Sequence, residues 1–578
     1  MQRVVTAAAA TFMLAAVGCG QRAVASADTT PTKTASVFPA GWTVGEGKQP
    51  VTAAHGMVVS NSSLASEAGV EILKAGGNAV DAAVATGFAL AVTFPQAGNI
   101  GGGGFMVIHM ADGRSAAIDY REIAPLAATR DMYVGKTGKL TSRFGALASG
   151  VPGAVAGMSM ALKQYGTMSL AQVMAPAIKL ASDGFVVDSA LSDAVSGAAK
   201  LIKPFDGAPL FFPGGNANAP GSKLVQSDLA NTLRKIAKDG PSAFYTGAVA
   251  DSFAAEQRRD HGIITTADLA AYKAIAREPV IGTYRGDTVI SMPPSSSGGI
   301  TAIESLNILE KWAKLPPFGS TAYNHDVAEA FRRAFIDRNT LLGDPAFVKV
   351  PMAHLISKAY ADTLWKTIRP DSATPSPTFN ADRKEKMQTT HYSVVDDKGN
   401  AVSTTTTLNG YFGGGAYVRG AGFFLNNEMD DFATEPGKPN MFGLVQGEAN
   451  AIVAGKRMLS SMTPTIVLDR TGKVLLVVGA AGGPTITTTT VQIILNVVDN
   501  HMGIAEAMSA PRIHEQTWPD RLDYEKGGMT QAVVDSLKAM GYTLHEVGHL
   551  ANSNDILRVA GGWSGMVEPR SHGGAVGY

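Results

Sequence analysis

The pattern of apolar and polar residues divides the chain into strand-like and helix-like stretches. β-Branched and aromatic residues dominate positions 389–395, and a second β-rich run covers positions 401–408. Turn-forming residues separate the two runs, which together predict a β-hairpin. With the turn centred on Lys398, Thr389 faces Thr407 at the open end of the hairpin. This register places two hydroxyl groups side by side, an arrangement that is also common in ordinary sheets.

A second hairpin is predicted from the β-rich runs 465–468 and 474–478. With its turn centred on Thr471, Ser460 comes level with Gly482. In both predicted hairpins, a short turn brings candidate site residues that precede and follow it to the same level.

Helices are predicted where apolar residues recur at positions i, i+3 and i+4. The clearest of them cover residues 169–182, 224–238, 249–258 and 323–342. Residues 81–92 are apolar on most faces, which favours a helix inside the core over one in a membrane. The helix that ends near Leu73 is expected to be capped by Ser63 or Ser66.

A glycine-rich stretch at residues 98–104 invites comparison with a phosphate-binding loop. That motif needs a Lys-Ser or Lys-Thr pair and a helix directly after it. Here no such pair follows, and residues 105–109 form a β-rich run. We expect these glycines to permit close backbone packing instead.

Composition narrows the class of protein. The 578 residues carry 49 Lys+Arg and 49 Asp+Glu, so nothing indicates a basic face for nucleic acid. Charged residues make up only 17% and glycine contributes 64 positions, which favours a compact, loop-rich enzyme over a disordered or coiled-coil protein.

The N-terminus predicts export. Residues 1–27 combine a basic start, an apolar run too short for a comfortable membrane span, and a small-x-small cleavage site. An alternative is a bacterial lipoprotein signal, in which Cys19 is lipidated and becomes the mature N-terminus. Cys19 is the only cysteine, so the remaining chain has neither a disulfide nor a thiol nucleophile.

A polar, proline-containing linker at residues 370–388 runs directly into the strand that begins at Thr389. A cut at this junction would expose an N-terminal threonine. Such a residue carries its own general base, because its free α-amine can accept the proton of its own hydroxyl. The unperturbed pKa of an α-amine, about 7.7–8.0, leaves a useful neutral fraction near pH 7.

The run Thr-Thr-His-Tyr-Ser-Val-Val at 389–395 resembles the start of the small subunit of γ-glutamyltranspeptidases, also called glutathione hydrolases. The resemblance extends from about Gly56 to the C-terminus. It implies an α+β fold, the four-layer αββα N-terminal-nucleophile hydrolase sandwich formed by both cleavage products. It also implies autocatalytic cleavage between Gln388 and Thr389, which gives a large subunit (28–388) and a small subunit (389–578).

The same resemblance assigns roles to individual residues. The catalytic set that it implies consists of the nucleophile, its hydroxyl partner and two oxyanion-hole glycines: Thr389, Thr407, Gly482 and Gly483. The glutamyl-binding set that it implies holds the α-carboxylate through Arg121, Ser460 and Ser461, and the α-amino group through Asn409, Glu428 and Asp431. An arginine suits a carboxylate because its planar fork donates two parallel hydrogen bonds.

Two positions depart from the family pattern. Phe442 occupies the tip of a lid-like loop, residues 436–450, where the bacterial archetype has a tyrosine, so any hydrogen bond of that hydroxyl is missing. Pro484 follows the glycine pair where the family often has arginine or another polar residue.

The resemblance implies cleavage of γ-glutamyl amide bonds in glutathione and related compounds through a γ-glutamyl-Thr389 intermediate. The acceptors would be water, amino acids or peptides. It implies no cofactor and no metal, and the two subunits would form a heterodimer. We expect an exported, periplasmic protein with no nucleic-acid partner, attached to a membrane only if Cys19 is lipidated.

Three alternatives remain open. One is an acylase of the same fold with a different acyl donor. Another is a zinc endopeptidase, because His545 and His549 fit the pattern H-E-x-x-H; that pattern works on a helix, whereas Gly541 has just ended one here. The last is an uncut envelope protein that only binds glutamyl peptides, for which a gel would show full-length chain.

Overall fold

The computed structural model describes residues 37–376, 389–435 and 437–578. The predicted export signal with Cys19, and positions 377–388 of the predicted linker, lie outside the described residues. Residues 38–578 form one compact unit. Within the described ranges, no helix is both long and apolar enough to cross a lipid bilayer.

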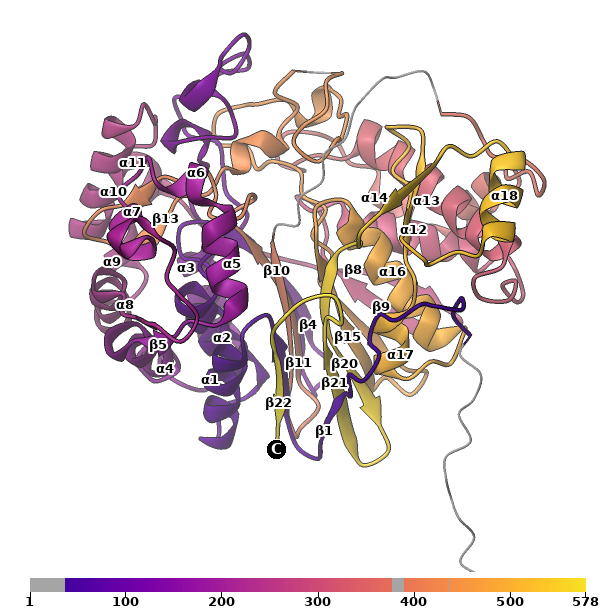
Figure 1. The fold of residues 1–578 in the computed structure, drawn as a ribbon, viewed down its shortest axis with the longest axis horizontal. Coiled ribbons are helices and arrows are strands. Elements are labelled where there is room, and N and C mark those ends of the chain that lie inside the picture. The colour runs from indigo at the N-terminus through magenta and orange to yellow at the C-terminus, as the bar shows by residue number, and fades with distance from the viewer. Residues whose placement is uncertain (1–36, 377–388, 436) are drawn as a thin grey trace, which may run out of the picture. The chain divides into compact units, whose positions relative to one another are not determined.

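Two antiparallel sheets form the centre of this unit (Figure 1). The first sheet has the strand order β22 (Gly574–Gly577), β2 (Met57–Ser60), β10 (Thr390–Val395), β11 (Ala401–Thr407), β3 (Gly103–His109), β4 (Ser115–Asp119) and β7 (Ile275–Arg277). The second has the order β1 (Val51–Ala53), β21 (Gly562–Val567), β20 (Asn552–Val559), β15 (Val474–Val478), β14 (Thr465–Leu468), β9 (Asp287–Ser291) and β8 (Val280–Tyr284), with β16 (Ala480–Ala481) beside β20. Each sheet combines strands from both sides of position 389.

Side-chain alternation along the strands sorts the apolar residues into separate cores. Met57 and Val59 of β2 face the second sheet, where they join a core with Val477. Val58 points the other way, into the core beneath the helices of the first sheet. On the second sheet, Leu476 likewise belongs to the core beneath its own helices. The two sheets are thus buried on both faces.

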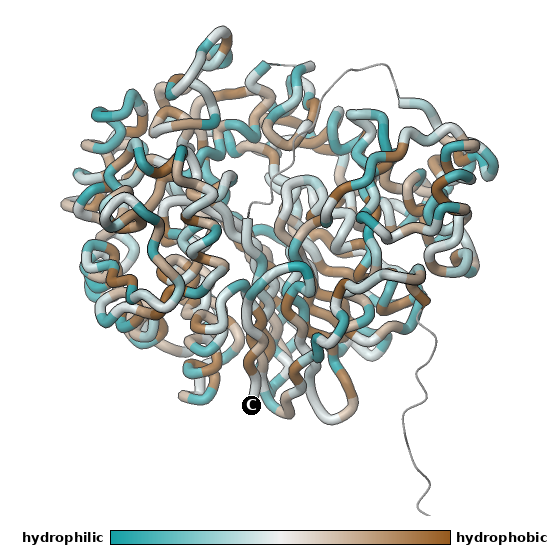
Figure 2. Tube along the Cα trace, viewed as in Figure 1, coloured by the Kyte–Doolittle hydropathy of each residue, from teal (hydrophilic) through white to brown (hydrophobic). Residues whose placement is uncertain are grey.

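Helices cover the outer face of each sheet and complete four layers (Figure 1). The first sheet packs on α1 (Ser63–Lys74) and α2 (Ala79–Thr93), and the second on α12 (Gly298–Leu309) and α16 (Thr485–Val498), while α13 (Thr321–Leu341) packs against α12. Figure 2 shows apolar positions recurring along the central strands. This arrangement confirms the predicted αββα sandwich of mixed α and β structure.

The remaining elements are shorter or peripheral. The helices are α3 (Ala154–Tyr165), α4 (Leu170–Asp183), α5 (Ser189–Gly197), α6 (Ala199–Ile202), α7 (Ala208–Phe211), α8 (Ser227–Asp239), α9 (Ser242–Tyr245), α10 (Ala248–Arg259), α11 (Thr266–Ala271), α14 (Met352–Leu355), α15 (Lys358–Trp365), α17 (Ile504–Ser509) and α18 (Gln531–Ala539). The strands are β5 (Phe185–Val186), β6 (Lys223–Leu224), β12 (Tyr417–Val418), β13 (Phe423–Phe424), β17 (Ile513–His514), β18 (Leu522–Glu525) and β19 (Leu544–Val547).

The predicted helices are present, with two corrections at their starts. α8 begins at Ser227 because the preceding Leu224 pairs with β5 as part of β6. In α1, Ser63 is already helical and Ser62 is the N-cap. The hydroxyl of Ser66 donates to the carbonyl oxygen of Gly574 at 2.7 Å. Its tertiary role is to tie α1 to the edge of the first sheet, which a local capping rule does not foresee.

The two hairpin predictions fare differently. In β10–β11 the register is as predicted, with Val395 opposite Ala401 and Thr390 opposite Thr406. In β14–β15 the predicted register is wrong by one residue. A turn centred on Thr471 places Thr465 opposite Val477, whereas in the structure Thr465 lies opposite Val478. The pairing shifts at an irregularity between Val467 and Leu468, which inserts one extra residue.

The glycine-rich stretch at 98–104 packs as predicted, against other backbone. A Cβ atom on Gly101 would lie 2.1 Å from the carbonyl oxygen of Phe424, and one on Gly102 would lie 2.1 Å from that of Thr407. These distances leave no room for a side chain. The stretch leads into a strand, β3, and so lacks the helix that a phosphate-binding loop requires.

A buried acid on β20 fixes the second sheet to the segment that precedes the Gly482-Gly483 pair. Asp555 is fully buried, accepts a hydrogen bond from the backbone N–H of Gly479 at 3.3 Å, and bonds the hydroxyl of Ser553. Burial raises the pKa of Asp555 to about 8. The folded protein therefore keeps this carboxyl group protonated near neutral pH.

Replacing Asp555 with asparagine is expected to remove a pH-dependent loss of stability. An unfolded aspartate has a pKa near 3.9, so between about pH 4 and pH 8 the folded chain binds one proton more than the unfolded chain. The contribution of the Asp555 carboxyl group to the free energy of unfolding is full below pH 4 and declines as the pH rises toward 8. The melting temperature of Asp555→Asn, measured relative to the parent, should therefore climb by a few degrees from pH 5 to pH 8. A constant difference across that range would contradict the assignment.

Candidate active site

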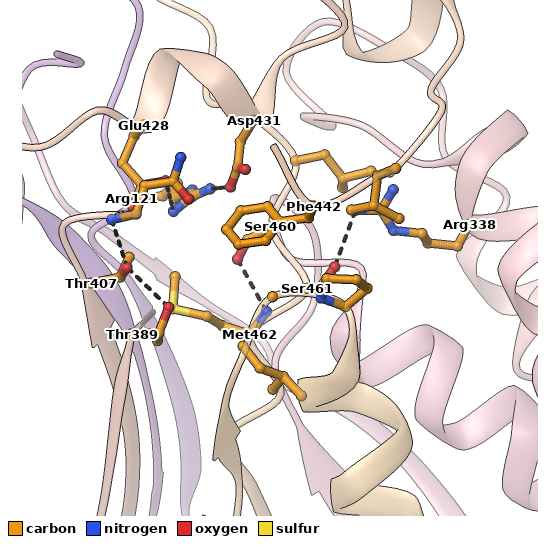
Figure 3. Close-up of a pocket in the computed structure, with 16 residues that line it drawn as sticks. Arg121, Arg338, Thr389, Thr407, Glu428, Asp431, Phe442, Ser460, Ser461 and Met462 are labelled. Carbon is orange, nitrogen blue, oxygen red and sulfur yellow. Dashed lines mark hydrogen bonds and ion pairs between the residues drawn. The ribbon is translucent and has the colours of Figure 1, made fainter. Parts of the chain in front are cut away.

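The predicted nucleophile lies where β10 begins, at the open end of the first hairpin. The Oγ1 atoms of Thr389 and Thr407 are 3.1 Å apart. The Thr407 oxygen also accepts a hydrogen bond from the backbone N–H of Asn409 at 2.7 Å. The two hydroxyl groups are thus hydrogen-bonded to each other, and the N–H of Asn409 holds the Thr407 side chain in place (Figure 3).

Thr389 opens into a pocket that gathers residues from distant parts of the chain. Every predicted site residue except Gly482 lines it. The lining consists of Arg121, Arg338, Thr389, Thr407, Asn409, Glu428, Asp431, Phe442, Leu444, Leu459, Ser460, Ser461, Met462, Gly483, Pro484 and Ile486. Residues that are 310 positions apart in the sequence therefore meet in one cavity, as the contact of Arg121 with Asp431 shows.

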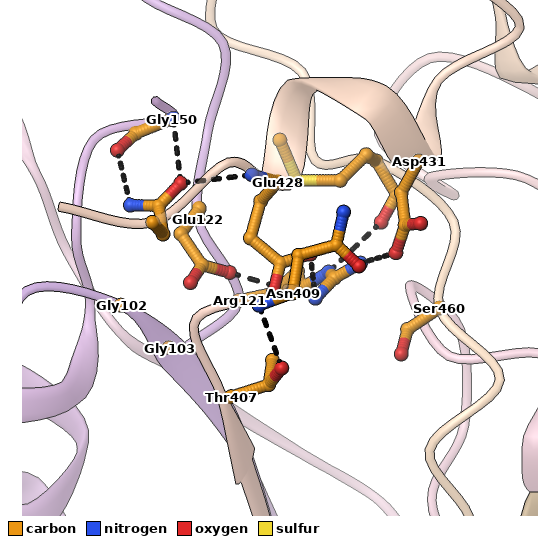
Figure 4. A network of polar contacts seen from close by, with 12 residues as sticks. Gly102, Gly103, Arg121, Glu122, Gly150, Thr407, Asn409, Glu428, Asp431 and Ser460 are labelled. Carbon is orange, nitrogen blue, oxygen red and sulfur yellow. Dashed lines mark hydrogen bonds and ion pairs between the residues drawn. The ribbon is translucent and has the colours of Figure 1, made fainter. Parts of the chain in front are cut away.

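Arg121 is buried among three carboxyl groups (Figure 4). Its Nη1 lies 2.7 Å from Glu428 Oε2 and 3.6 Å from Glu122 Oε2, and its Nη2 pairs with Asp431. Its Nε donates to the carbonyl oxygen of Met458 at 3.3 Å. Both ends of the predicted fork are thus already engaged, so an incoming carboxylate must share these donors or displace an acid.

The electrostatics of this cluster follow from burial. Burial raises the pKa of Glu428 and of Asp431, and it raises the pKa of Glu122 to about 8, while the charge of Arg121 opposes each shift. The charge of Arg121, and for Asp431 also that of Arg338, does not cancel these shifts, so burial favours a protonated carboxyl group within the cluster. Glu122 is a site residue that the sequence analysis missed, and its only local signal is its position next to Arg121.

Asn409 lies beside this cluster (Figure 4) and has a φ of 68°, a conformation that asparagine tolerates better than most residues. Its Nδ2 donates to the carbonyl oxygen of Asn427 at 3.0 Å and to the sulfur of Met441 at 3.5 Å. The amide is therefore held between the loop before Glu428 and the lid-like loop.

The adjacent serines form the other wall of the pocket. The Ser460 hydroxyl accepts a hydrogen bond from the backbone N–H of Met462 at 3.1 Å, and the Ser461 hydroxyl accepts one from Arg338 Nη2 at 3.1 Å (Figure 3). A serine-rich loop before α12 holds the backbone of this wall, because Ser297 N–H donates to the Ser460 carbonyl oxygen at 2.8 Å. This supporting role of the serine-rich loop was not predicted from the sequence.

The glycine pair lies directly before α16. Gly482 and Gly483 have φ values of 138° and 59°, which favour glycine. The hydroxyl of Thr485 donates to the Gly482 carbonyl oxygen at 2.6 Å and fixes the peptide plane between the glycines. Pro484 occupies the N-cap of α16 with φ −66°, a position where a residue without an N–H is tolerated. The helix start adds a positive dipole end beside the pocket.

The lid-like loop covers the pocket beside Gly483. Phe442 is buried, packs with Phe335 and Leu444, and leaves no space for a side chain on Gly483. The backbone N–H of Met441 donates to Asp430 Oδ2 at 2.8 Å. The loop is thus fixed by apolar packing and by this backbone contact.

The H-E-x-x-H pattern does not have the geometry of a zinc site. His545 lies in β19, a strand that spans Leu544–Val547, where residues four apart do not share a helical face. Its Nδ1 bonds Asp523 at 2.9 Å. The structure therefore contradicts the zinc endopeptidase alternative.

An N-terminal-nucleophile hydrolase is the class that this fold and site define: a threonine at the start of a central strand, in a sandwich of two sheets between helical layers. The family described as Gamma-glutamyltranspeptidase matches residues 65–578. The chain belongs to the γ-glutamyltranspeptidase family, as its sequence motifs indicate.

Individual relatives agree with this placement. The chain is 50% identical to the "Glutathione hydrolase proenzyme" of Escherichia coli (strain K12) over 490 residues, 83% of this chain and 84% of the relative. It is 41% identical to the "Acylase ACY 1 proenzyme" of Pseudomonas sp. (strain SE83), over 86% of this chain and 88% of the relative. The crystal structure of cephalosporin acylase from Bacillus halodurans superposes with a TM-score of 0.81 at 27% identity, covering 92% of this chain and 97% of that one.

Proposed function

We propose that the protein is a self-processing γ-glutamyltransferase and glutathione hydrolase. The observation that carries the proposal is the hydroxyl pair of Thr389 and Thr407, 3.1 Å apart, at one end of a pocket whose walls carry Arg121 and two serines. A γ-glutamyl group has matching features, with a reactive carbonyl at one end and a carboxylate and an ammonium group at the other.

In the proposed reaction the free α-amine of Thr389 accepts the hydroxyl proton while the oxygen attacks the γ-carbonyl. Backbone N–H groups at Gly482 and Gly483 would stabilise the oxyanion. The C–N bond then breaks, the leaving amine takes the proton, and a γ-glutamyl ester of Thr389 remains. Water or the amino group of an acceptor cleaves this ester and regenerates the hydroxyl group.

Self-cleavage before Thr389 and a stable pair of cleavage products each have a structural support besides the family. Thr389 has a φ of 101°, in the left-handed region that a β-branched residue rarely adopts. Cleavage removes the preceding peptide and with it this constraint. Each sheet also combines strands from both sides of the cut, which favours a stable heterodimer of residues 28–388 and 389–578.

Export completes the proposal. The basic start, apolar run and small-residue cleavage site of residues 1–27 support transport to the periplasm. Lipidation of Cys19 is the competing fate of the same segment. Mass measurement of the mature N-terminus separates the two outcomes, because one begins at Asp28 and the other at a lipid-modified Cys19.

A second candidate is an acylase with a different acyl donor, which the 41% identity to the Acylase ACY 1 proenzyme favours. Two carboxylates near the pocket, Glu428 and Asp431, suit a donor that bears an ammonium group. A γ-glutamyl donor has this group, whereas a glutaryl donor has only the carboxylate.

The test combines N-terminal sequencing of the purified protein with two chromogenic donors, a γ-glutamyl anilide and a glutaryl anilide. We expect a fragment that begins at Thr389 and turnover of the γ-glutamyl donor at least about tenfold faster, since an ionic contact of 1.5–3 kcal/mol is lost with glutaryl. Faster turnover of the glutaryl donor would favour the acylase, and an uncut, inactive chain would overturn both.

Phe442→Tyr is expected to raise transfer relative to hydrolysis. The phenylalanine closes over the pocket by apolar contact alone, whereas a tyrosine hydroxyl could bond a polar partner such as Asn409. A firmer lid admits less water. One hydrogen bond contributes about 0.5–1.5 kcal/mol, so the ratio of γ-glutamyl product to free glutamate should rise only a few-fold at a fixed acceptor concentration.

Phe442→Leu is the matched control for this change, because it keeps an apolar side chain and adds no hydroxyl. Its ratio should not rise. If the ratio of Phe442→Tyr is unchanged or lower, Phe442 is an ordinary loop aromatic without a gating role.

A further inference from the structure

Arg338 is a buried cation at the edge of the candidate active site. It belongs to α13, is 1% exposed and lines the pocket. Among the residues that the structure describes, no carboxylate forms an ion pair with it. Burial lowers the pKa of Arg338 to about 10, and the charge of Asp431 opposes this shift from beyond ion-pair distance, so the guanidinium stays charged at neutral pH.

The other buried arginines of α13 behave differently. Arg332 pairs with Glu515 at 3.1 Å, and Arg333 pairs with Glu329 at 2.6 Å. Removing a charge from water without a counter-charge is costly, so structural arginines are normally paired in this way. Arg338 is the exception among the three, and exceptions of this kind concentrate at functional sites.

Its hydrogen bonds connect three parts of the pocket. Nη2 donates to Ser461 Oγ at 3.1 Å, and Nη1 donates to the side-chain oxygens of Asn339 at 3.0 Å and Gln446 at 3.2 Å. Gln446 lies in the lid-like loop and donates in turn to the carbonyl oxygen of Asp431 at 3.0 Å. The guanidinium is therefore held in place on the far side of Ser461 from Thr389 (Figure 3).

The contact with Ser461 determines what that hydroxyl can do. Arginine has donors only, so Ser461 Oγ must accept from it, and the serine proton is left to point elsewhere. No acceptor for this proton is recorded among the described residues, and Ser461 lines the pocket. The neighbouring Ser460 is arranged the same way, since its oxygen accepts from the N–H of Met462. Both serines thus offer their protons to the pocket.

The charge balance at the opposite wall makes a second cation useful. Arg121 is already paired with Glu428 and Asp431, so that cluster carries no surplus positive charge when either acid is ionised. A donor carboxylate that binds Arg121 must share the guanidinium with these acids, so the net attraction that Arg121 offers is reduced. Arg338, behind Ser461, adds positive potential that reaches the donor carboxylate through the polarised Ser461 hydroxyl. Charges are weakly screened in a buried pocket of this kind.

We propose that Arg338 is a positioning and specificity residue for the donor's α-carboxylate, acting through Ser461. It orients the Ser461 hydroxyl as a donor and adds the positive potential that a carboxylate-bearing substrate needs. The inference rests on the proposed γ-glutamyl function. It adds a residue to the donor site that the family motifs in the sequence did not identify.

The test is a double-mutant cycle of Arg338→Gln and Ser461→Ala on the matured enzyme, with a γ-glutamyl anilide as donor. Arg338→Gln alone should raise KM about 10- to 100-fold, the range expected for a hydrogen bond that serves a charged group, with kcat changed less than about threefold. In the Ser461→Ala background, Arg338→Gln should raise KM by at most a further few-fold. Effects that multiply in full would show that Arg338 does not act through Ser461.

Three further measurements exclude a merely structural role. Arg338→Lys, which keeps a charged donor, should recover part of the lost donor affinity. Self-cleavage should proceed in every variant, because the precursor peptide has no free α-carboxylate. Arg333→Gln, the matched control on the same helix, should lower the melting temperature and leave KM within about threefold of the parent. If Arg338→Gln raised KM no more than this control, the inference would be wrong.

The outcomes also separate the inference from the proposed function. If the parent enzyme does not turn over the γ-glutamyl donor, the proposed function fails. If the parent is active and the cycle shows no coupling, only the role of Arg338 fails. If Arg338→Gln does not accumulate as folded protein, Arg338→Lys in the two Ser461 backgrounds supplies the same cycle, with a smaller expected change in KM.

Discussion

Replacing Thr389 with alanine is expected to leave a single uncut chain of about 60 kDa and to abolish turnover. The hydroxyl that would attack the preceding carbonyl is lost, and so is the nucleophile of every later cycle. The parent should instead yield residues 389–578 as a fragment of about 20 kDa, by its share of the chain. Loss of a nucleophile typically costs several orders of magnitude in rate, about 10⁴- to 10⁶-fold. A denaturing gel and an assay with a γ-glutamyl anilide measure both effects.

Two controls sharpen this result. Thr389→Ser keeps a hydroxyl and should still mature. Thr390→Ala removes the neighbouring hydroxyl, which donates to Asn61 Oδ1 at 2.8 Å and not to the pocket, so cleavage should continue. If Thr389→Ala still matured at this bond, Thr389 would not be the nucleophile.

Arg121→Lys is expected to weaken donor binding by about 100-fold or more while self-cleavage continues. Lysine keeps one positive charge but cannot span Glu428 and Asp431 as the guanidinium does. The donor carboxylate then loses the two parallel hydrogen bonds of the guanidinium, and the buried acids lose part of their compensation. The effect should appear in KM, and maturation on a gel should be unchanged, because the internal peptide has no α-carboxylate.

Arg285→Lys is the matched control for Arg121→Lys. Arg285 also pairs with a carboxylate, Asp499 at 2.9 Å, but lies outside the pocket. It should leave the donor KM within about threefold of the parent. An Arg121→Lys protein with parental KM would remove Arg121 from the donor site.

The sequence determined the local features of this protein. β-Branched runs separated by a five-residue turn set the register of β10 and β11, and the side-chain period of two placed Thr389 beside Thr407. The helical periods predicted α4, α10 and α13 within a residue or two. The motif that begins at Thr389 indicated the family, the resemblance assigned roles to Arg121 and Glu428, and the pocket brings these three residues together. Each of these signals acts over a few residues, so it survives without knowledge of the fold.

Only the tertiary structure decided the electrostatics of the site. Arg121 is paired with Glu428 and Asp431, and Glu122 lies buried beside them. These contacts join chain segments that are about 300 residues apart. Arg338 has the same helical pattern around it as its paired neighbours on α13, and that it forms no ion pair with a carboxylate of the described residues is a property of packing alone. The shift in register between β14 and β15 likewise has no local signature. Desolvation and charge compensation depend on what surrounds a side chain from every direction, and a linear pattern does not contain that information.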